Sequence, residues 1–132
     1  MDRQSTGVPW AGMEDWVRDA DPFDRTCPSR ALLASLGDKW SILIILSLDG
    51  EQLRYGELEQ AVDGISPKML TQRLRRLVDD GILVRWEFDE VPPHVAYELT
   101  DLGRSLLPVF YPFIGWLIDH SPAVAEHRGS AG

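Results

Sequence analysis

The sequence is poor in cysteine and has no long apolar run, and both shortages restrict what the chain can be. A single cysteine, Cys27, among 132 residues rules out a disulfide within the chain. The longest mostly apolar stretch, from Trp40 to Leu48, is interrupted by Ser41 and Ser47 and falls well short of the roughly 18 apolar residues of a membrane span. The first residues also do not show the basic and then apolar pattern of a secretory signal. We therefore expect a cytoplasmic chain with no membrane partner.

Groups suited to catalysis or metal binding are scarce as well. The three histidines, His94, His120 and His127, are scattered, and no second cysteine accompanies them, so a zinc site is not expected. No nucleotide-binding loop, Ser-His-Asp order or carboxylate pair stands out. We expect neither an enzyme nor a cofactor.

Positive charge is the third shortage, and its distribution is informative. The chain carries 13 Lys and Arg against 21 Asp and Glu, for a net charge of −8 at pH 7. Between Ser66 and Trp86, however, five basic residues stand against two acidic ones, a local charge of +3. A polyanion such as nucleic acid would be attracted to this segment and repelled by the rest of the chain.

The hydrophobic content of 44% is sufficient for one core, and the local patterns predict its elements. We expect an arm over residues 1–24 with a short helix near 13–19, a domain over 25–120, and a disordered tail over 121–132. Pro108 and Pro112 are expected to bend the last helix or to divide it in two. The expected elements of the domain are helices over 28–36, 40–48, 55–62, 66–80 and 102–120, and strands over 82–88 and 94–99. This order predicts a mainly α fold with a small β-hairpin, a winged helix-turn-helix.

The helix expected over 66–80 has the most informative pattern. Ser66 and Pro67 form a strong helix start, and Gly81 ends the helix. One side carries the apolar stripe Leu70, Leu74, Leu77 and Val78. The opposite side carries long polar side chains: Lys68, Gln72, Arg75, Arg76 and Asp79.

Such a polar side is often no more than a solvated surface. Here the preceding short helix and turn, the following proline-tipped hairpin and the local positive charge favour a second interpretation. They are typical of a recognition helix that enters the major groove of DNA.

Three segments carry a resemblance to a known family. They are CPSRALLASLGDKWSILIILSL, RYGELEQAVDGISPKMLTQRLRRLVDDGIL and VPPHVAYELTDLGRSLLPV, and together they resemble the HxlR-type winged-helix regulators from about Cys27 to Trp116. The resemblance implies a homodimeric transcriptional regulator whose dimer forms through the helices over 28–36 and 102–119. It also implies DNA contacts from Ser66, Lys68, Met69, Gln72, Arg73 and Arg76, with His94 contributing from the wing.

The wing departs from the family pattern. His94 stands where the family often has arginine, and Glu87, Asp89 and Glu90 make the hairpin acidic. We therefore expect the wing to contribute little to affinity and the recognition helix to contribute most.

Cys27 is a candidate redox sensor. It directly precedes Pro28 at a helix N-terminus, where the helix dipole favours a thiolate. Some members of the resembled family sense oxidants or electrophiles with a cysteine at this position, through an intersubunit disulfide or a modification. The alternative is a small packing residue with no redox role.

Aromatic side chains make the last helix apolar on most of its circumference. Phe110, Phe113 and Trp116, with Trp16 from the arm, predict a surface that needs a partner. The expected partner is a second copy of the chain. The alternative, compatible with the first, is a pocket for a hydrophobic small-molecule effector built with Trp10, Trp16 and Trp40.

These expectations combine into a repressor that binds double-stranded DNA at a two-fold-related operator and responds to an oxidant or a small molecule. Two other classes stay open. A protein-interaction module on the same fold would not bind DNA specifically, and its binding would not show the steep salt dependence of DNA binding. A small enzyme or ligand carrier would use the aromatic cluster, but no paired catalytic residues support it.

Overall fold

The computed structural model describes residues 14–131, and their contacts divide the chain into two compact units. The first unit runs through Asp38 and the second begins at Lys39. The pattern of the sequence predicted a division after residue 24, with the helix over 28–36 inside the winged-helix domain. The structure groups that helix with the preceding residues.

The first unit contains two short helices. Helix α1 spans Asp15–Ala20 and ends at Asp21, whose backbone is in the left-handed conformation (φ 47°). Helix α2 spans Pro28–Leu36 and begins with a proline, as expected, because the missing N–H of proline has no helical partner at this position. The expected arm helix is thus found at 15–20, while Met13 and Trp10 lie outside the described residues.

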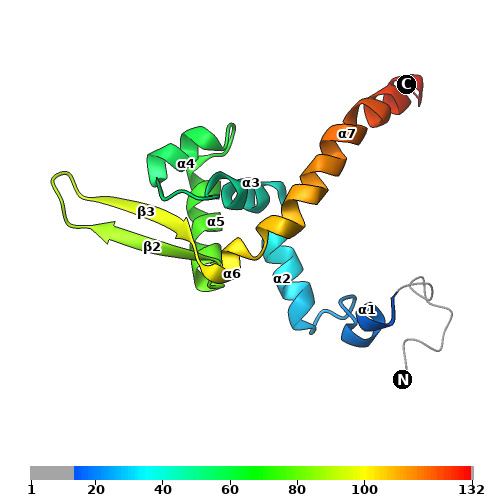
Figure 1. Cartoon of the computed structure of the whole chain (residues 1–132), viewed down its shortest axis with the longest axis horizontal. Helices are drawn as coiled ribbons and strands as arrows, with labels where there is room; N and C mark the ends of the chain where they lie inside the picture. The colour runs from blue at the N-terminus through cyan, green and yellow to red at the C-terminus, as the bar shows by residue number, and fades with distance from the viewer. Residues whose placement is uncertain (1–13, 132) are drawn as a thin grey trace. The chain divides into compact units, whose positions relative to one another are not determined.

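The second unit contains a helical bundle and a three-stranded antiparallel sheet of order β1-β3-β2 (Figure 1). Strand β1, Leu53–Arg54, pairs with Tyr97 and Ala96 of β3 and so adds a third strand to the expected hairpin. The other elements are α3 Lys39–Ser47, α4 Tyr55–Ala61, α5 Pro67–Asp79, β2 Leu83–Phe88, β3 His94–Leu99, α6 Asp101–Arg104 and α7 Leu107–Ala131.

The core forms around α3, whose sequence is apolar nearly all round. Ile44 and Ile45 of α3 are fully buried, as are Leu58 of α4 and Leu70 and Leu77 of α5. Burial of these aliphatic side chains is the main force that holds the three helices together. The apolar stripe predicted for α5 is therefore the side of that helix that faces the core.

A threonine fixes the connection between the sheet and α6. The Thr100 hydroxyl accepts a hydrogen bond from the Gly103 N–H (3.0 Å) and donates one to the Gly81 carbonyl (2.6 Å). Gly103 is buried so close to β2 that a side-chain methyl there would overlap the Ile82 carbonyl oxygen. Helix α6 can approach the sheet this closely only because position 103 has no side chain.

The C-terminal region differs from its prediction in two ways. The last helix divides at Ser105 and Leu106 into α6 and α7, so Pro108 lies in the first turn of α7 and only Pro112 of the two lies in its interior. The expected disordered tail is corrected, because α7 continues through Pro122 to Ala131. One proline removes only one helical N–H, and the alanines that follow it are the best helix formers.

Within residues 14–131, no helix combines the length and the apolar character that crossing a membrane requires.

Candidate nucleic-acid interface

Helix α5 presents three different sides. The buried side is the leucine stripe described above. Met69, Arg73 and Arg76 lie half-buried along one flank. The side open to solvent carries the polar residues Ser66, Lys68, Thr71, Gln72 and Arg75. The sequence analysis included Arg75 in the polar side of the helix, but the residues implied by the family resemblance did not include it.

Ser66 caps the start of α5. Its hydroxyl oxygen accepts the N–H of Met69 at 3.1 Å, so this oxygen is committed to the helix end. The hydroxyl proton is not used in that bond. Ser66 is exposed and can still donate a hydrogen bond to an outside acceptor.

Arg73 and Gln72 act as a pair. The Arg73 guanidinium donates to the side-chain oxygen of Gln72 at 3.2 Å. This bond leaves the amide NH2 of Gln72 as the group that an outside acceptor meets. The half-buried Arg73 therefore orients Gln72 from the flank of the helix.

Tyr55, at the start of α4, connects the two helices of the helix-turn-helix. Its hydroxyl donates to the Pro67 carbonyl at 3.1 Å and lies 3.1 Å from the Thr71 hydroxyl. The first turn of α5 is thereby held against α4. From the sequence, Tyr55 was expected only as the start of a helix, because nothing local indicates a bond to residues 12 and 16 positions later.

On the wing, His94 is engaged by its neighbours. Its ring stacks on Phe88 at a centroid distance of 4.6 Å, and its Nδ1 lies 3.7 Å from a Glu90 carboxylate oxygen. Only 17% of its side chain is exposed. His94 is thus part of the packing of the hairpin as well as a predicted DNA contact.

Arg85 occupies the face of the hairpin that is turned toward the helices. It stands directly opposite Tyr97 on β3 and forms an ion pair with Glu87 two residues along β2. Hydrogen bonds to the Tyr97 side chain and then to Glu87 raise the pKa of the Arg85 guanidinium above its ordinary value. The sequence analysis counted the charge of Arg85 but did not place it at the interface.

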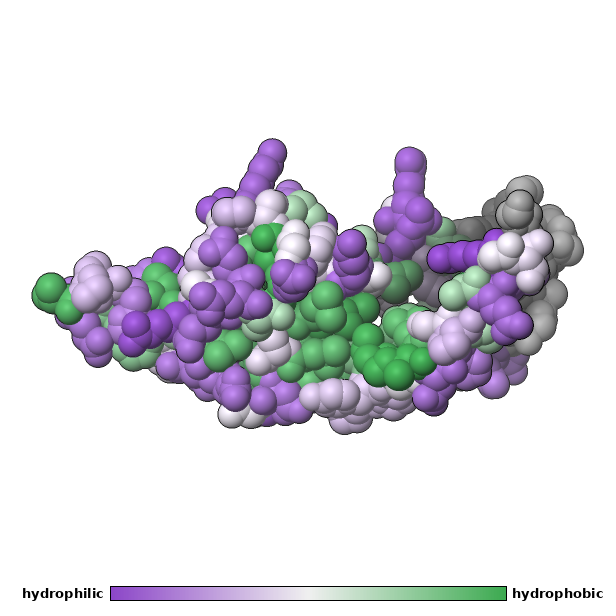
Figure 2. Space-filling model, turned by 90° about the horizontal axis from the view of Figure 1, so that it is seen from above, coloured by the Kyte–Doolittle hydropathy of each residue, from purple (hydrophilic) through white to green (hydrophobic). Residues whose placement is uncertain are grey.

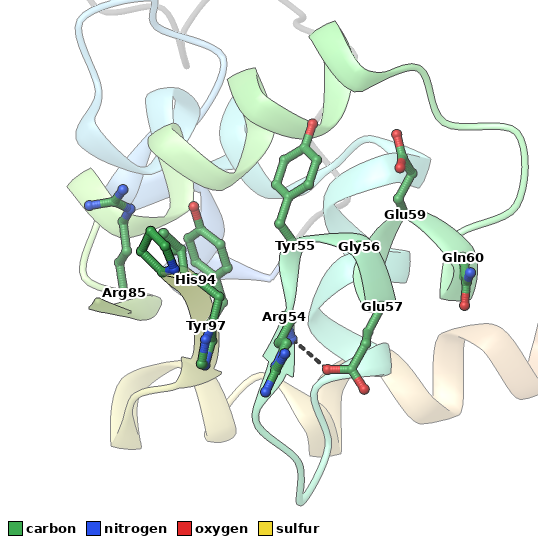
Figure 3. Close-up of a pocket in the computed structure, with 11 residues that line it drawn as sticks. Arg54, Tyr55, Gly56, Glu57, Glu59, Gln60, Arg85, His94 and Tyr97 are labelled. Atoms are coloured by element: carbon green, nitrogen blue, oxygen red, sulfur yellow. Dashed lines mark hydrogen bonds between the residues drawn. The ribbon is translucent and has the colours of Figure 1, made fainter. Parts of the chain in front are cut away.

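Hollows lie along the hairpin, and two of them adjoin the helices of the helix-turn-helix. The larger, about 710 Å³, lies between α4 and β3 and is lined by Arg54, Tyr55, Arg85, His94 and Tyr97 among others. Figure 3 shows Tyr55 and Arg54 on one side of it and Arg85, His94 and Tyr97 on the other. The smaller, about 390 Å³, lies between α5 and the strands and is lined by Thr71, Leu74, Arg75, Val78, Asp79, Arg85 and Tyr97.

The other predicted site residues lie elsewhere. Cys27 is half-buried before α2, and its thiol donates to the Ala20 carbonyl at 3.1 Å. Trp16 belongs to the first unit and is 72% exposed, whereas Trp40 belongs to the second unit. The effector pocket predicted from Trp10, Trp16 and Trp40 therefore stays a prediction.

Helix α7 carries an exposed apolar stripe, with one correction to the prediction. Phe110 is buried in the core (8% exposed) and does not belong to the surface. Val109, Phe113 and Trp116 are spaced by four and three residues, so they share one face of the helix, and each is at least half exposed. Figure 2 shows hydrophobic surface that is open to solvent on the side of the molecule drawn there.

Among residues 14–131, no three histidine, cysteine or acidic side chains are grouped so that they could hold a metal ion.

Comparison with known proteins agrees with this architecture. An uncharacterized HTH-type transcriptional regulator of Escherichia coli, YtfH, is 34% identical over 85% of this chain and 89% of its own length. The structure of a Salmonella typhimurium YtfH superposes with a TM-score of 0.75 at 36% identity, covering 81% of this chain and 96% of that one. The redox regulator HypR in its reduced form superposes with a TM-score of 0.68 at 30% identity, covering 75% of this chain and 98% of HypR.

The family match extends over both helices of the helix-turn-helix, the wing and most of α7. Residues 35–124 match the HxlR-like helix-turn-helix family. The winged-helix fold and the order of motifs predicted from the sequence are thereby confirmed. This chain belongs to the HxlR-like helix-turn-helix family of transcriptional regulators.

Proposed function

We propose that this chain is a transcriptional repressor that binds a two-fold-related DNA operator as a homodimer, with α5 in the major groove. The observation that carries the proposal is the exposed side of α5. Lys68 and Gln72 project there from the first half of the helix, next to a wing and within a segment of net positive charge. Recognition helices of this fold contact base edges with their N-terminal residues.

Each exposed group has a chemical role in this arrangement. The amide NH2 of Gln72, oriented by Arg73, can donate to the N7 acceptor of a purine edge. Lys68 supplies a charged donor to guanine acceptors, and Met69 an apolar contact to a thymine methyl group. Ser66 donates to a backbone phosphate near the N-terminus of α5, and Arg76 adds positive charge on the flank.

The exposed stripe of α7 supports the homodimer. Isolated apolar side chains are common on surfaces, but Val109, Phe113 and Trp116 form a continuous face on one helix. A two-fold dimer formed through this face presents two copies of α5. We expect their half-sites to lie about 34–36 Å apart, one turn of the double helix.

Cys27 is our candidate for an oxidant response. Its position before α2 and the resemblance to HypR, which is named a redox regulator, support this assignment. With diamide as oxidant, two Cys27 thiols of a dimer would form one disulfide and lose two protons and two electrons, and the diamide would be reduced to the hydrazine.

The test is the affinity of the purified chain for the DNA upstream of its own gene, measured by fluorescence anisotropy at two salt concentrations, with and without diamide. We expect specific, salt-sensitive binding that diamide weakens in the wild type and not in Cys27→Ser. Lys68→Ala and Gln72→Ala should each weaken operator binding by about 1–3 kcal/mol. Arg73→Ala should weaken it as well, because Gln72 loses its orientation.

Arg104→Ala is the matched control, since Arg104 lies on α6 and bonds the Leu99 carbonyl at 2.8 Å. Equal losses in Arg104→Ala and Lys68→Ala would overturn the assignment of α5 as the recognition helix. Failure of the wild type to bind any duplex specifically, with or without oxidant, would favour the protein-interaction module.

A further inference from the structure

The smaller hollow beside α5 has a composition that the recognition-helix interpretation does not explain. We propose that this hollow, between α5 and the β2–β3 hairpin, binds a backbone phosphate of DNA through Arg75 and Arg85, and that Glu87 competes with the phosphate for Arg85. The proposal rests on the proposed function, because it extends the DNA interface from α5 toward the wing.

The two arginines approach the hollow from different elements. Arg75 projects from the exposed side of α5, three residues after Gln72 and four after Thr71, so it lies on the same side of the helix one turn later. Arg85 projects from β2 with 45% of its side chain exposed. Both line the same hollow of about 390 Å³, and the hydroxyl-bearing side chains of Thr71 and Tyr97 line it with them.

These groups are suited to a phosphate. A guanidinium offers several N–H donors in a planar fork that fits phosphate oxygens, and the Tyr97 hydroxyl adds a further donor. The Thr71 hydroxyl is not a further donor, because Tyr55 donates its own proton to Pro67 and so accepts the proton of Thr71. The Tyr97 side chain stands opposite Arg85 on β3 and is almost completely buried, so a fixed side chain lies beside Arg85. The donors are therefore positioned before any ligand arrives.

Carboxylates oppose this positive charge. Asp79 lines the hollow, and Glu87 forms an ion pair with Arg85. The Glu87 side chain is 70% exposed, so a phosphate can replace it on the guanidinium without leaving a buried charge unpaired. The acidic wing noted in the sequence therefore lowers DNA affinity at one defined arginine, Arg85.

Continuity with α5 identifies DNA as the source of the phosphate. Thr71 and Arg75 border the hollow and also belong to the solvent-exposed side of α5 that carries Lys68 and Gln72. A duplex with its major groove on Lys68 and Gln72 must run one of its strands along this border. Contacts to that strand would fix the register of α5 without reading sequence.

The experiment compares the affinity of the full-length variants for the operator and for a scrambled duplex over a series of salt concentrations. Arg85→Ala and Arg75→Ala should each lower the affinity for the operator and for the scrambled duplex by the same factor. Each should also reduce the slope of log K against log salt by about 0.9, the value for one lost phosphate contact. Glu87→Gln should raise the affinity for both duplexes, because it releases Arg85 from its ion pair.

Matched controls separate these effects from general charge effects. Arg104→Ala removes a positive charge from α6, and Asp89→Asn removes a negative charge from the hairpin without touching the Arg85–Glu87 ion pair. Arg104→Ala should change the affinity less than Arg75→Ala or Arg85→Ala does, and Asp89→Asn should change it less than Glu87→Gln does. Thermal unfolding and circular dichroism establish that each variant folds.

Four outcomes would overturn the proposal. If both arginine variants keep the wild-type salt slope, Arg75 and Arg85 do not contact a phosphate. If the variants lose affinity for the operator alone, the two arginines recognise bases instead. Equal gains in affinity in Glu87→Gln and Asp89→Asn would show that Glu87 does not compete with the phosphate for Arg85. A rise in melting temperature with inorganic phosphate alone, lost in Arg85→Ala while DNA binding is unchanged, would assign the hollow to a free anion. A wild type that binds no duplex would instead refute the proposed function itself.

Discussion

At the scale of single residues, two glycines of the C-terminal helices have opposite surroundings. Gly103 of α6 is buried against the Ile82 carbonyl, whereas a Cβ at Gly115 of α7 would have no described atom within 4 Å apart from its chain neighbours and the backbone of its own helix. The same substitution should therefore have opposite effects at the two positions.

We expect Gly103→Ala to lower the free energy of unfolding by about 1–3 kcal/mol, because the added methyl forces α6 away from β2. Gly115→Ala should instead raise it by about 0.5–1 kcal/mol, because alanine has less conformational freedom to lose in a helix. Urea unfolding followed by circular dichroism measures both. A Gly103→Ala protein as stable as the wild type would show that α6 does not approach the sheet this closely.

At the scale of elements, a hydrogen bond joins α7 to Asp49, just beyond the end of α3. The Tyr111 hydroxyl donates to an Asp49 carboxylate oxygen at 2.5 Å. This bond, with smaller contributions from burial and from the negative charge of Asp49, raises the pKa of Tyr111 above its ordinary value of 10.0. A pKa that is higher in the folded protein means that the bond stabilises the fold below pH 10 and stops doing so as the pH rises through the folded pKa.

The expected result is a difference between wild type and Tyr111→Phe that depends on pH. Wild type should be the more stable below pH 10, and the difference should disappear above the pKa of Tyr111 in the folded protein. The pKa of Tyr111 follows from tyrosinate absorbance, as the difference between the pH titrations of wild type and Tyr111→Phe. Asp49→Asn keeps an acceptor but removes the charge, so it should lower the pKa of Tyr111. A Tyr111 titration midpoint at or below 10 in the wild type would contradict the hydrogen bond.

Elements with local signals were predictable from the sequence. Ser66 and Pro67 mark the start of α5, and the change to strand spacing after Gly81 marks the hairpin, so the helix-turn-helix and wing were expected close to their observed bounds. The hollow beside Arg85 was not, because it depends on which face of the hairpin packs toward α5. That choice follows from the register that sets Arg85 opposite Tyr97, and from packing between segments distant in the sequence.

The C-terminal helix α7 also shows that the sequence alone does not predict tertiary packing. Its apolar composition correctly predicted an exposed aromatic surface, but it did not separate Phe110 from Phe113. Phe110 and Phe113 are three residues apart and so lie on nearly the same side of the helix, and only the tertiary packing along α7 buries Phe110 and leaves Phe113 exposed. Continuation of α7 beyond Pro122 was also missed, since residues 121–132 were expected to form a disordered tail at the chain end.

At the scale of the whole molecule, the chain consists of two units, and the second carries both the proposed DNA interface and the apolar stripe of α7. A repressor needs both on one rigid body, because the spacing of the two copies of α5 depends on how the dimer is joined. Loss of the dimer should therefore reduce operator affinity even when α5 is untouched.

Trp116→Lys tests this link between dimer and operator. Lysine places a charge within the stripe, and a tryptophan buried in an interface typically contributes about 2 kcal/mol or more, roughly 30-fold in the dimer dissociation constant. Sedimentation velocity should show a shift toward monomer, and operator affinity should fall in the same variant. Val91→Lys makes the same change at a fully exposed apolar residue of the hairpin tip and should leave the sedimentation profile unaltered. A Trp116→Lys protein that remains dimeric would place the two-fold interface elsewhere, and one that is monomeric but binds the operator with wild-type affinity would show that a single α5 is sufficient.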